Sequence, residues 1–95
     1  MGPVVGLIRW QLSIPGCHSL KEKRMVVRSL KDRIRHRFNV SVAETAYQDV
    51  WTRAELSVAV VSEERAFADT VLDKVNQLVC SDTRALVSAT QRDFY

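Results

Sequence analysis

Positive charge is concentrated in one short segment of this chain. Residues 21–37 contain eight of the fourteen lysines and arginines against two acidic residues, which gives the segment a net charge of +6. The rest of the chain carries six basic and nine acidic residues, a net charge of −3. Clustered lysine and arginine side chains bind the phosphates of nucleic acids and acidic protein surfaces. This segment is therefore the first candidate for a binding site.

The basic segment has the pattern of an amphipathic helix. Its apolar residues Val26, Val27, Leu30 and Ile34 recur at the spacing of one buried stripe. At about 100° per residue, five cations fall within an arc of roughly 80°, centred about 120° from that stripe. The helix can therefore bury one side and present a row of charge on another, for binding or only for solubility. The five cations are Lys21, Arg24, Arg28, Lys31 and Arg35.

A second candidate site is the face of a sheet that no helix covers. Arg9, Trp51 and Arg53 fall at positions expected on that face, among apolar residues. Aromatic and arginine side chains on a sheet can stack on nucleotide bases, although the glycine–aromatic signature of sheet-surface RNA-binding modules is missing. Apolar residues on an open face more often mark self-association. We therefore expect a homodimer through this face more than base stacking.

Cys17 and His18 directly precede the basic segment. A thiol near the start of a helix, beside Lys21 and Lys23, would have a lowered pKa and raised reactivity. The chain has one further cysteine, Cys80, and one further histidine, too few for a metal site of the usual spacing. The two cysteines can become neighbours in space, but an inert, buried cysteine is the more frequent outcome.

No pattern in the sequence indicates catalysis. Glu44, Asp49 and Glu55 flank the expected central hairpin, but their spacing does not compel acid–base chemistry. The sequence contains no glycine-rich phosphate loop, nucleophile elbow or metal-ligand cluster. We therefore expect neither enzymatic activity nor a cofactor or metal.

The elements that must position these residues begin with a strand and a helix. Residues 3–14 alternate between apolar and polar types, which predicts a half-buried strand that ends at Pro15 and Gly16. A helix begins at Ser19 and ends near residue 38. Ser19 and Glu22 fit a reciprocal capping box, in which each side chain accepts from the backbone N–H of the other.

The rest of the chain is expected to form three more strands and a second helix. Residues 40–47 and 51–61 predict two strands joined by a short turn. Ser62 is expected to cap a second helix with two glutamates in its first turn. A final strand is expected over residues 84–90. The side chains expected to face the core from the second helix are Phe67, Val71, Leu72, Val75, Leu78 and Val79.

These six elements predict one ferredoxin-like domain spanning residues 1–95. Right-handed β-α-β connections place the β-α-β-β-α-β order in a two-layer sandwich, with a four-stranded antiparallel sheet and both helices on one face. Ninety-five residues fit one domain. The N-terminus lacks the basic region of a secretory signal, and no apolar run is long enough to span a membrane. We expect a cytoplasmic protein that does not bind membranes.

The sequence also resembles the YlxP-like family of small bacterial proteins. The resemblance covers nearly the whole chain and is most specific in the stretch Pro-Gly-Cys-His-Ser-Leu-Lys-Glu-Lys-Arg at residues 15–24. It continues in Phe-Asn-Val-Ser-Val-Ala-Glu at residues 38–44 and Val-Ala-Val-Val-Ser at residues 58–62. The resemblance implies a ferredoxin-like fold and a cytoplasmic location. It implies no activity, but the genomic neighbours of the family favour work on RNA or the ribosome.

Two functions therefore remain open. The first is a non-catalytic RNA- or ribosome-associated binding module. The second is a homodimeric protein-interaction module whose basic helix docks an acidic protein partner. A thiol enzyme that uses Cys17 is the least favoured alternative. In the first, Lys21, Lys23, Arg24, Arg28, Lys31 and Arg35 contact phosphates, and Arg9, Arg53 and Trp51 contribute weaker contacts.

Overall fold

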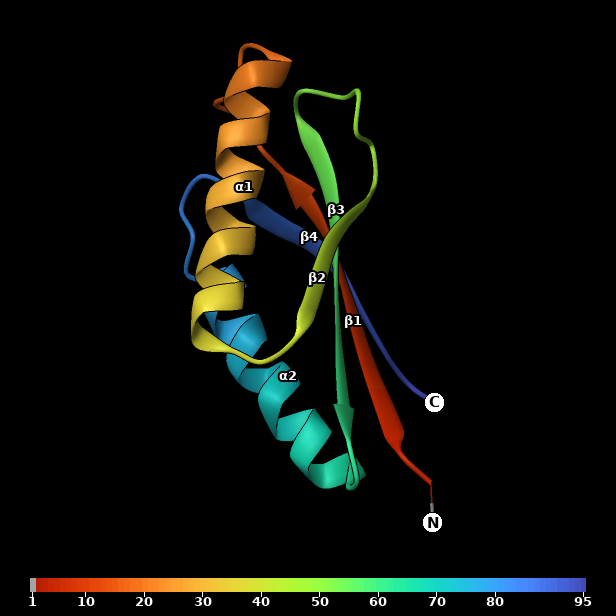
Figure 1. The fold of residues 1–95 in the computed structure, drawn as a ribbon. Coiled ribbons are helices and arrows are strands. Elements are labelled where there is room, and N and C mark those ends of the chain that lie inside the picture. The colour runs from red at the N-terminus through yellow and green to blue at the C-terminus, as the bar shows by residue number, and fades with distance from the viewer. Residues whose placement is uncertain (1) are drawn as a thin grey trace.

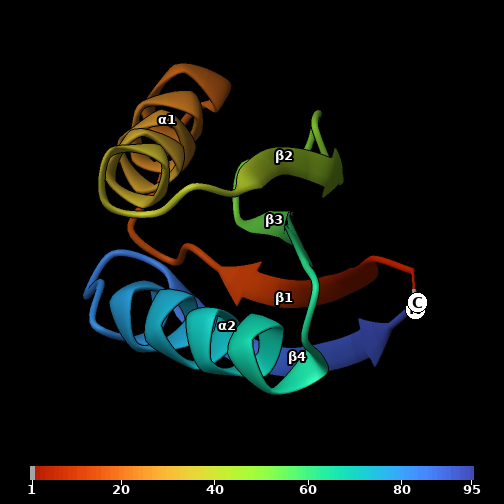
Figure 2. The same cartoon turned by 60° about the horizontal axis from the view of Figure 1, so that its bottom comes forward.

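The two halves of the chain interlock in one four-stranded sheet. The computed structural model describes residues 2–95, and its elements are β1 (Val4–Ser13), α1 (Leu20–Arg37), β2 (Ser41–Ala46), β3 (Arg53–Ser62), α2 (Arg65–Cys80) and β4 (Leu86–Phe94). The strands stand in the order β2-β3-β1-β4, and all neighbours are antiparallel. Both helices lie on the same face of the sheet (Figure 2). The predicted ferredoxin-like sandwich is therefore confirmed.

The core lies between the sheet and the two helices. Even-numbered residues 6–12 of β1 and 54–60 of β3 point towards the helices and are buried. Trp10 is fully buried among them, and its indole N–H donates to Asn76 Oδ1 on α2 over 2.8 Å. That bond satisfies the one polar group of the indole. The strand residues of this layer are Ile8, Trp10 and Leu12 of β1 with Ala54, Leu56, Val58 and Val60 of β3.

The start of α1 follows the expected capping pattern with one difference. Ser19 is the N-cap, and its hydroxyl accepts from the backbone N–H of Glu22 over 3.1 Å. The Glu22 carboxylate reaches one residue further back than expected and accepts from the backbone N–H of His18 over 2.7 Å. Both contacts satisfy N–H groups at the helix start that have no partner within the helix.

The expected start of α2 is wrong by two residues. Ser62 pairs with Val4 as the last residue of β3, so it belongs to the sheet. The N-cap is Glu64, which makes no side-chain capping bond, and no acidic residue lies in the first turn. Phe67, expected in the core, is 58% exposed, and Ala68 occupies the buried position instead. No helix within residues 2–95 has both the length and the apolar character needed to cross a membrane.

The last strand runs further than its composition indicated. β4 pairs with β1 as far as the Gly6–Phe94 pair, with a bulge between Gln11 and Leu12 that lets the register shift. Beyond it, Val5 and Tyr95 exchange two backbone hydrogen bonds of 2.9 and 2.8 Å. Val5 and Tyr95 therefore lie side by side, and the described part of the molecule is elongated, with principal extents of 48, 21 and 17 Å (Figure 1).

A buried carboxylate joins α1 to the connection between α2 and β4. Asp82 accepts from the backbone N–H of Arg84 over 2.8 Å and from its guanidinium over 2.8 and 3.2 Å. It also accepts from Arg33 of α1 over 3.1 Å. Hydrogen bonds from Arg84, followed by the nearby charges of Arg84 and Arg33, hold the pKa of Asp82 below its ordinary value near 3.8, against the opposing effect of burial.

Asp82→Asn is expected to lower the free energy of unfolding at neutral pH by about 1.5–3 kcal/mol, the usual range for hydrogen bonds to a charged group. Because the folded pKa is depressed, the carboxylate contributes fully above pH 3.8 and loses its contribution as the pH falls further. The difference between wild type and variant should therefore narrow below pH 3.8 in urea titrations. Asp49→Asn, an exposed change of the same kind, serves as the control; a gap that stays constant with pH would contradict this role of Asp82.

Candidate functional site

The first helix covers the β2 side of the sheet, and the second covers β1 and β3. α1 packs on β2, and its sheet-facing side buries Lys23, Val27, Leu30 and Ile34. One flank of α1 faces the α2–β4 connection, where Arg84 donates to Ser29 Oγ over 3.1 Å. The sheet-facing side of α1 separates Ser29 from the predicted row. The row is centred about 120° round the helix from Ser29, so its five cations lie on the other flank of α1.

This row, hereafter the basic row, consists of Lys21, Arg24, Arg28, Lys31 and Arg35. Four of its side chains are exposed, and Lys31 is partly covered. Within residues 2–95, the first four members make neither an ion pair nor a side-chain hydrogen bond. Arg35, at the end of the row, donates to the Val42 carbonyl of β2 over 3.2 Å and lies 3.9 Å from Asp32. Most of the row is therefore free to meet a ligand.

Three acidic side chains outside α1 are paired with cations that do not belong to the basic row. Asp82 is held by Arg33 and Arg84. Arg92 of β4 bridges Asp69 and Asp73 of α2 over 2.6 and 2.7 Å. Because these pairs lie on the α2 and β4 side, they neutralise charge away from the basic row. The charge asymmetry of the sequence is thus an asymmetry in space.

Lys23, predicted to contact phosphate, is not part of this surface. It is fully buried, and its ammonium lies 2.8 Å from Glu44 Oε2 on β2 and donates to the Tyr47 carbonyl. Its place follows from helical geometry, since it precedes Val27 by four residues and so lies on the buried side. This position could have been predicted from the sequence, because the residue one helical turn before Val27 in the apolar stripe is Lys23.

The connection between β2 and β3 is held in a defined shape. Tyr47 adopts a left-handed backbone conformation with φ of 64°, and its carbonyl accepts from Val50 N–H over 3.1 Å as well as from Lys23. Arg53 stacks on the Tyr47 ring at 4.2 Å and donates to its hydroxyl over 3.2 Å. Trp51, half exposed, belongs to this connection rather than to the sheet face.

The open sheet face does not bring Arg9, Trp51 and Arg53 together as one site. Arg9 lies within β1 and donates to Gln91 of β4 over 2.7 Å. Arg53 is engaged with Tyr47 at the start of β3. The aromatic platform expected on this face is therefore not assembled.

The same face has a polar half and an apolar half. In the polar half, Glu55 accepts from Thr45 over 2.6 Å and from Gln11 over 2.8 Å. The hydrogen bond from Thr45, ahead of that from Gln11, holds the pKa of Glu55 below its ordinary value despite partial desolvation. The apolar half consists of two cross-strand pairs, Val5 with Val61 and Leu7 with Ala59.

Cys17 does not have the reactive character expected of a thiol at a helix start. It is buried, and desolvation, followed by the charge of Glu22, raises its pKa above 9.0 although Lys23 acts in the opposite direction. Cys80 is exposed, and both thiols are free. A raised pKa leaves little nucleophilic thiolate at neutral pH.

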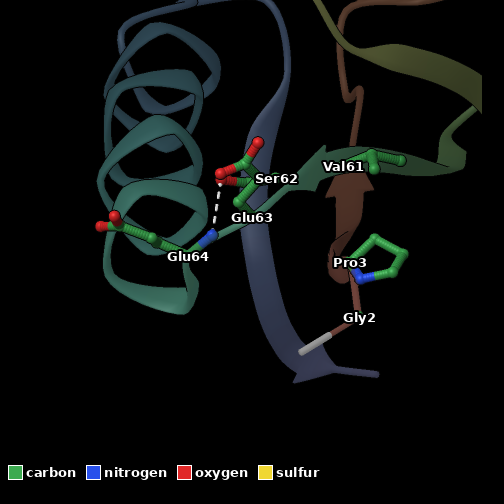
Figure 3. Close-up of a pocket in the computed structure, with 6 residues that line it drawn as sticks. All are labelled: Gly2, Pro3, Val61, Ser62, Glu63 and Glu64. Atoms are coloured by element: carbon green, nitrogen blue, oxygen red, sulfur yellow. Dashed lines mark hydrogen bonds between the residues drawn. The ribbon is translucent and has the colours of Figure 1, made fainter.

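The hollows of the surface bring together little that could do chemistry. An open depression of about 790 Å³ lies between the start of β1 and the turn from β3 to α2 (Figure 3). Its polar groups are Ser62, Glu63 and Glu64, and the Ser62 hydroxyl accepts from the backbone N–H of Glu64 over 3.1 Å. Within residues 2–95, no three histidine, cysteine or acidic side chains are grouped to hold a metal ion.

Removing the buried ammonium of Lys23 is expected to destabilise the fold. Lys23→Met leaves the Glu44 carboxylate without its cation and should lower the free energy of unfolding by about 2–4 kcal/mol. The double variant Lys23→Met, Glu44→Leu should recover most of this loss, since neither charge of this pair then remains. Urea unfolding followed by circular dichroism measures both. Arg24→Met, the exposed neighbour, is the matched control; an equal loss in that variant would rule out a special role for Lys23.

Comparisons with known proteins agree with the fold and with the resemblance seen in the sequence. Residues 5–92 match the family described as "Protein of unknown function (DUF503)". The "Uncharacterized protein YlxP" of Bacillus subtilis is 36% identical over 72 residues, which cover 76% of this chain and 78% of that protein. The de novo designed protein Foldit4 shares the fold alone, with a TM-score of 0.57 and 11% identity over 99% of this chain and 97% of its own. The chain therefore belongs to the DUF503 family.

Proposed function

We propose that this protein is a non-catalytic RNA-binding module that contacts structured or ribosomal RNA through the basic row of α1. The observation that carries the proposal is that Lys21, Arg24, Arg28 and Lys31 share one flank of α1 and, within residues 2–95, have no acidic partner. Such a role places the protein in the cytoplasm, where free thiols such as Cys17 and Cys80 stay reduced.

The length of the row suits a nucleic-acid backbone. From Lys21 to Arg35 the helix rises by about 21 Å, at about 1.5 Å per residue. A duplex carries about one phosphate charge per 1.7 Å of axis with both strands counted, so a duplex segment as long as the row carries on the order of a dozen phosphates, and those on the near side are within reach of the row. Four or five neutralised phosphates would release their counterions and make binding strongly dependent on salt.

The composition of the row favours phosphate over an acidic protein surface. Three of its five members are arginines, whose planar guanidinium matches the oxygens of a phosphate with two parallel hydrogen bonds. Protein interfaces are usually depleted of charge at their centre and are anchored by buried apolar side chains. Met25 is the large exposed apolar side chain of α1 and lies beside these cations, so charge outweighs apolar area on this surface, which favours RNA as its ligand.

The test is a fluorescence-anisotropy titration with a structured RNA at two salt concentrations. Wild type should bind with a slope of log affinity against log salt of roughly −4. Arg24→Glu with Arg28→Glu should weaken binding by roughly 10- to 100-fold, because two contacts are lost and two repulsions are added.

The matched control is Arg65→Glu with Lys74→Glu, which makes the same change in net charge at exposed positions of α2. It should stay within about threefold of wild type, since charges remote from the ligand are screened. Binding that ignores salt, or equal losses in the two double variants, would overturn the proposal. If wild type binds an acidic protein but does not change the anisotropy of the RNA, the protein-docking alternative is favoured.

A second candidate role is dimerisation through the apolar half of the open sheet face. The specific observation is the uncovered pairing of Val5 with Val61 and Leu7 with Ala59, in which the Val61 side chain is 69% exposed. Covering such a patch with a second copy would remove apolar surface from water.

Sedimentation velocity at micromolar concentration tests this role. Wild type should sediment as a dimer, and Val61→Glu should sediment as a monomer, because it places a charge inside the covered patch. Phe67→Glu, an exposed apolar residue of α2, is the control and should leave the dimer intact. A monomeric wild type would rule the dimer out.

A further inference from the structure

We propose that the basic row binds RNA beside an unpaired nucleotide, and that the base of this nucleotide stacks on Trp51. The inference rests on the proposed function and deepens it, since it names the class of RNA. Its ligand is a stem interrupted by a bulge, or closed by a loop, rather than an uninterrupted duplex.

Trp51 is placed where a base could reach it. Its side chain is 50% exposed, whereas Trp10, the other tryptophan, is fully buried. The backbone on either side of Trp51 is fixed, since the Thr52 carbonyl accepts from Ile14 N–H over 2.8 Å and the Val50 N–H donates to Tyr47 over 3.1 Å. The indole is therefore presented by an ordered segment, which reduces the entropy lost on binding.

The same segment is tied to the beginning of α1. Lys23 donates to the Tyr47 carbonyl and pairs with Glu44, so it links the first turns of α1 to the end of β2 and the connection that follows. Lys21 and Arg24, two residues before and one residue after Lys23, are exposed on these same turns. The start of α1 and the β2–β3 connection accordingly occupy the same end of the molecule (Figure 1).

Cations and an aromatic ring at one end of the molecule fit a particular kind of RNA. In a paired A-form helix the bases are stacked on one another, and the deep major groove keeps side chains from their edges. Bases in loops and bulges are unstacked and can lie on an aromatic ring, while the adjoining stem offers phosphates to the row. The connection carries one formal negative charge, Asp49, and Arg53 at the start of β3 carries the opposite charge.

Three RNA probes of matched length test the inference by fluorescence anisotropy at low salt: a stem with one bulged nucleotide, the same stem fully paired, and an unstructured single strand. Wild type should prefer the bulged stem to the paired stem by roughly 5- to 150-fold, the range measured for one stacked base. Trp51→Ala should remove this preference and leave the affinity for the paired stem unchanged. Trp51→Phe, which keeps an aromatic ring, should retain part of it.

Tryptophan fluorescence supplies an independent readout, because Trp10 is shielded within the core. The bulged stem should quench the emission of wild type and protect it from acrylamide. Both effects should vanish in Trp51→Phe, in which only Trp10 emits.

The possible outcomes distinguish the role of Trp51 from the proposed binding of RNA by the basic row. Equal affinity of wild type for the bulged and paired stems, with no loss in Trp51→Ala, overturns the role of Trp51 and leaves the basic row as an RNA site. Absence of binding to all three probes overturns both. The inference is also overturned if a partner protein binds wild type but not Trp51→Ala while the anisotropy of the RNA probes does not change. That result would assign Trp51 to a protein interface.

Discussion

Burying a lysine beside a strand is favourable only if its charge is matched, and Lys23 is matched by the Glu44 carboxylate and the Tyr47 carbonyl. These contacts hold the first turns of α1 beside the end of β2. Hydrogen bonds and ion pairs depend on direction, so they define this geometry more narrowly than apolar packing would. Loss of either partner would leave an unmatched charge in the core. The positions of the basic row and of the β2–β3 connection both depend on this contact.

The surface charge follows from where the other ion pairs lie. The α2–β4 connection is held by Asp82, which pairs with Arg33 and Arg84. Strand β4 is joined to α2 by Arg92, which pairs with Asp69 and Asp73. Within residues 2–95, Lys21, Arg24, Arg28 and Lys31 on the outer flank of α1 have no such counterpart, and Arg35 has only the distant Asp32. A net charge of only +3 therefore conceals a strongly directed field, of the kind that steers charged ligands.

Periodicity predicted the fold well because it records which side chains face the core. The alternation in β1 and the spacing of Val27, Leu30 and Ile34 in α1 both correspond to buried positions. The errors arose where composition and environment disagree. Lys23 is charged yet buried, and the β4 residues near Phe94 look polar in sequence yet pair with β1. The position of Trp51 depended on where β3 begins, which periodicity does not resolve to within two residues.

The backbone bonds between Val5 and Tyr95 have a consequence for the connectivity of the fold. Because the first and last strands are adjacent and their outer ends meet, a short linker from residue 95 to the start of β1 would close the chain into a ring without disturbing the sheet (Figure 1). New ends could then be opened in an exposed turn, such as the one between β3 and α2. The order of the six elements along the chain is thus separable from their arrangement in space, and circular permutants should keep the same packing.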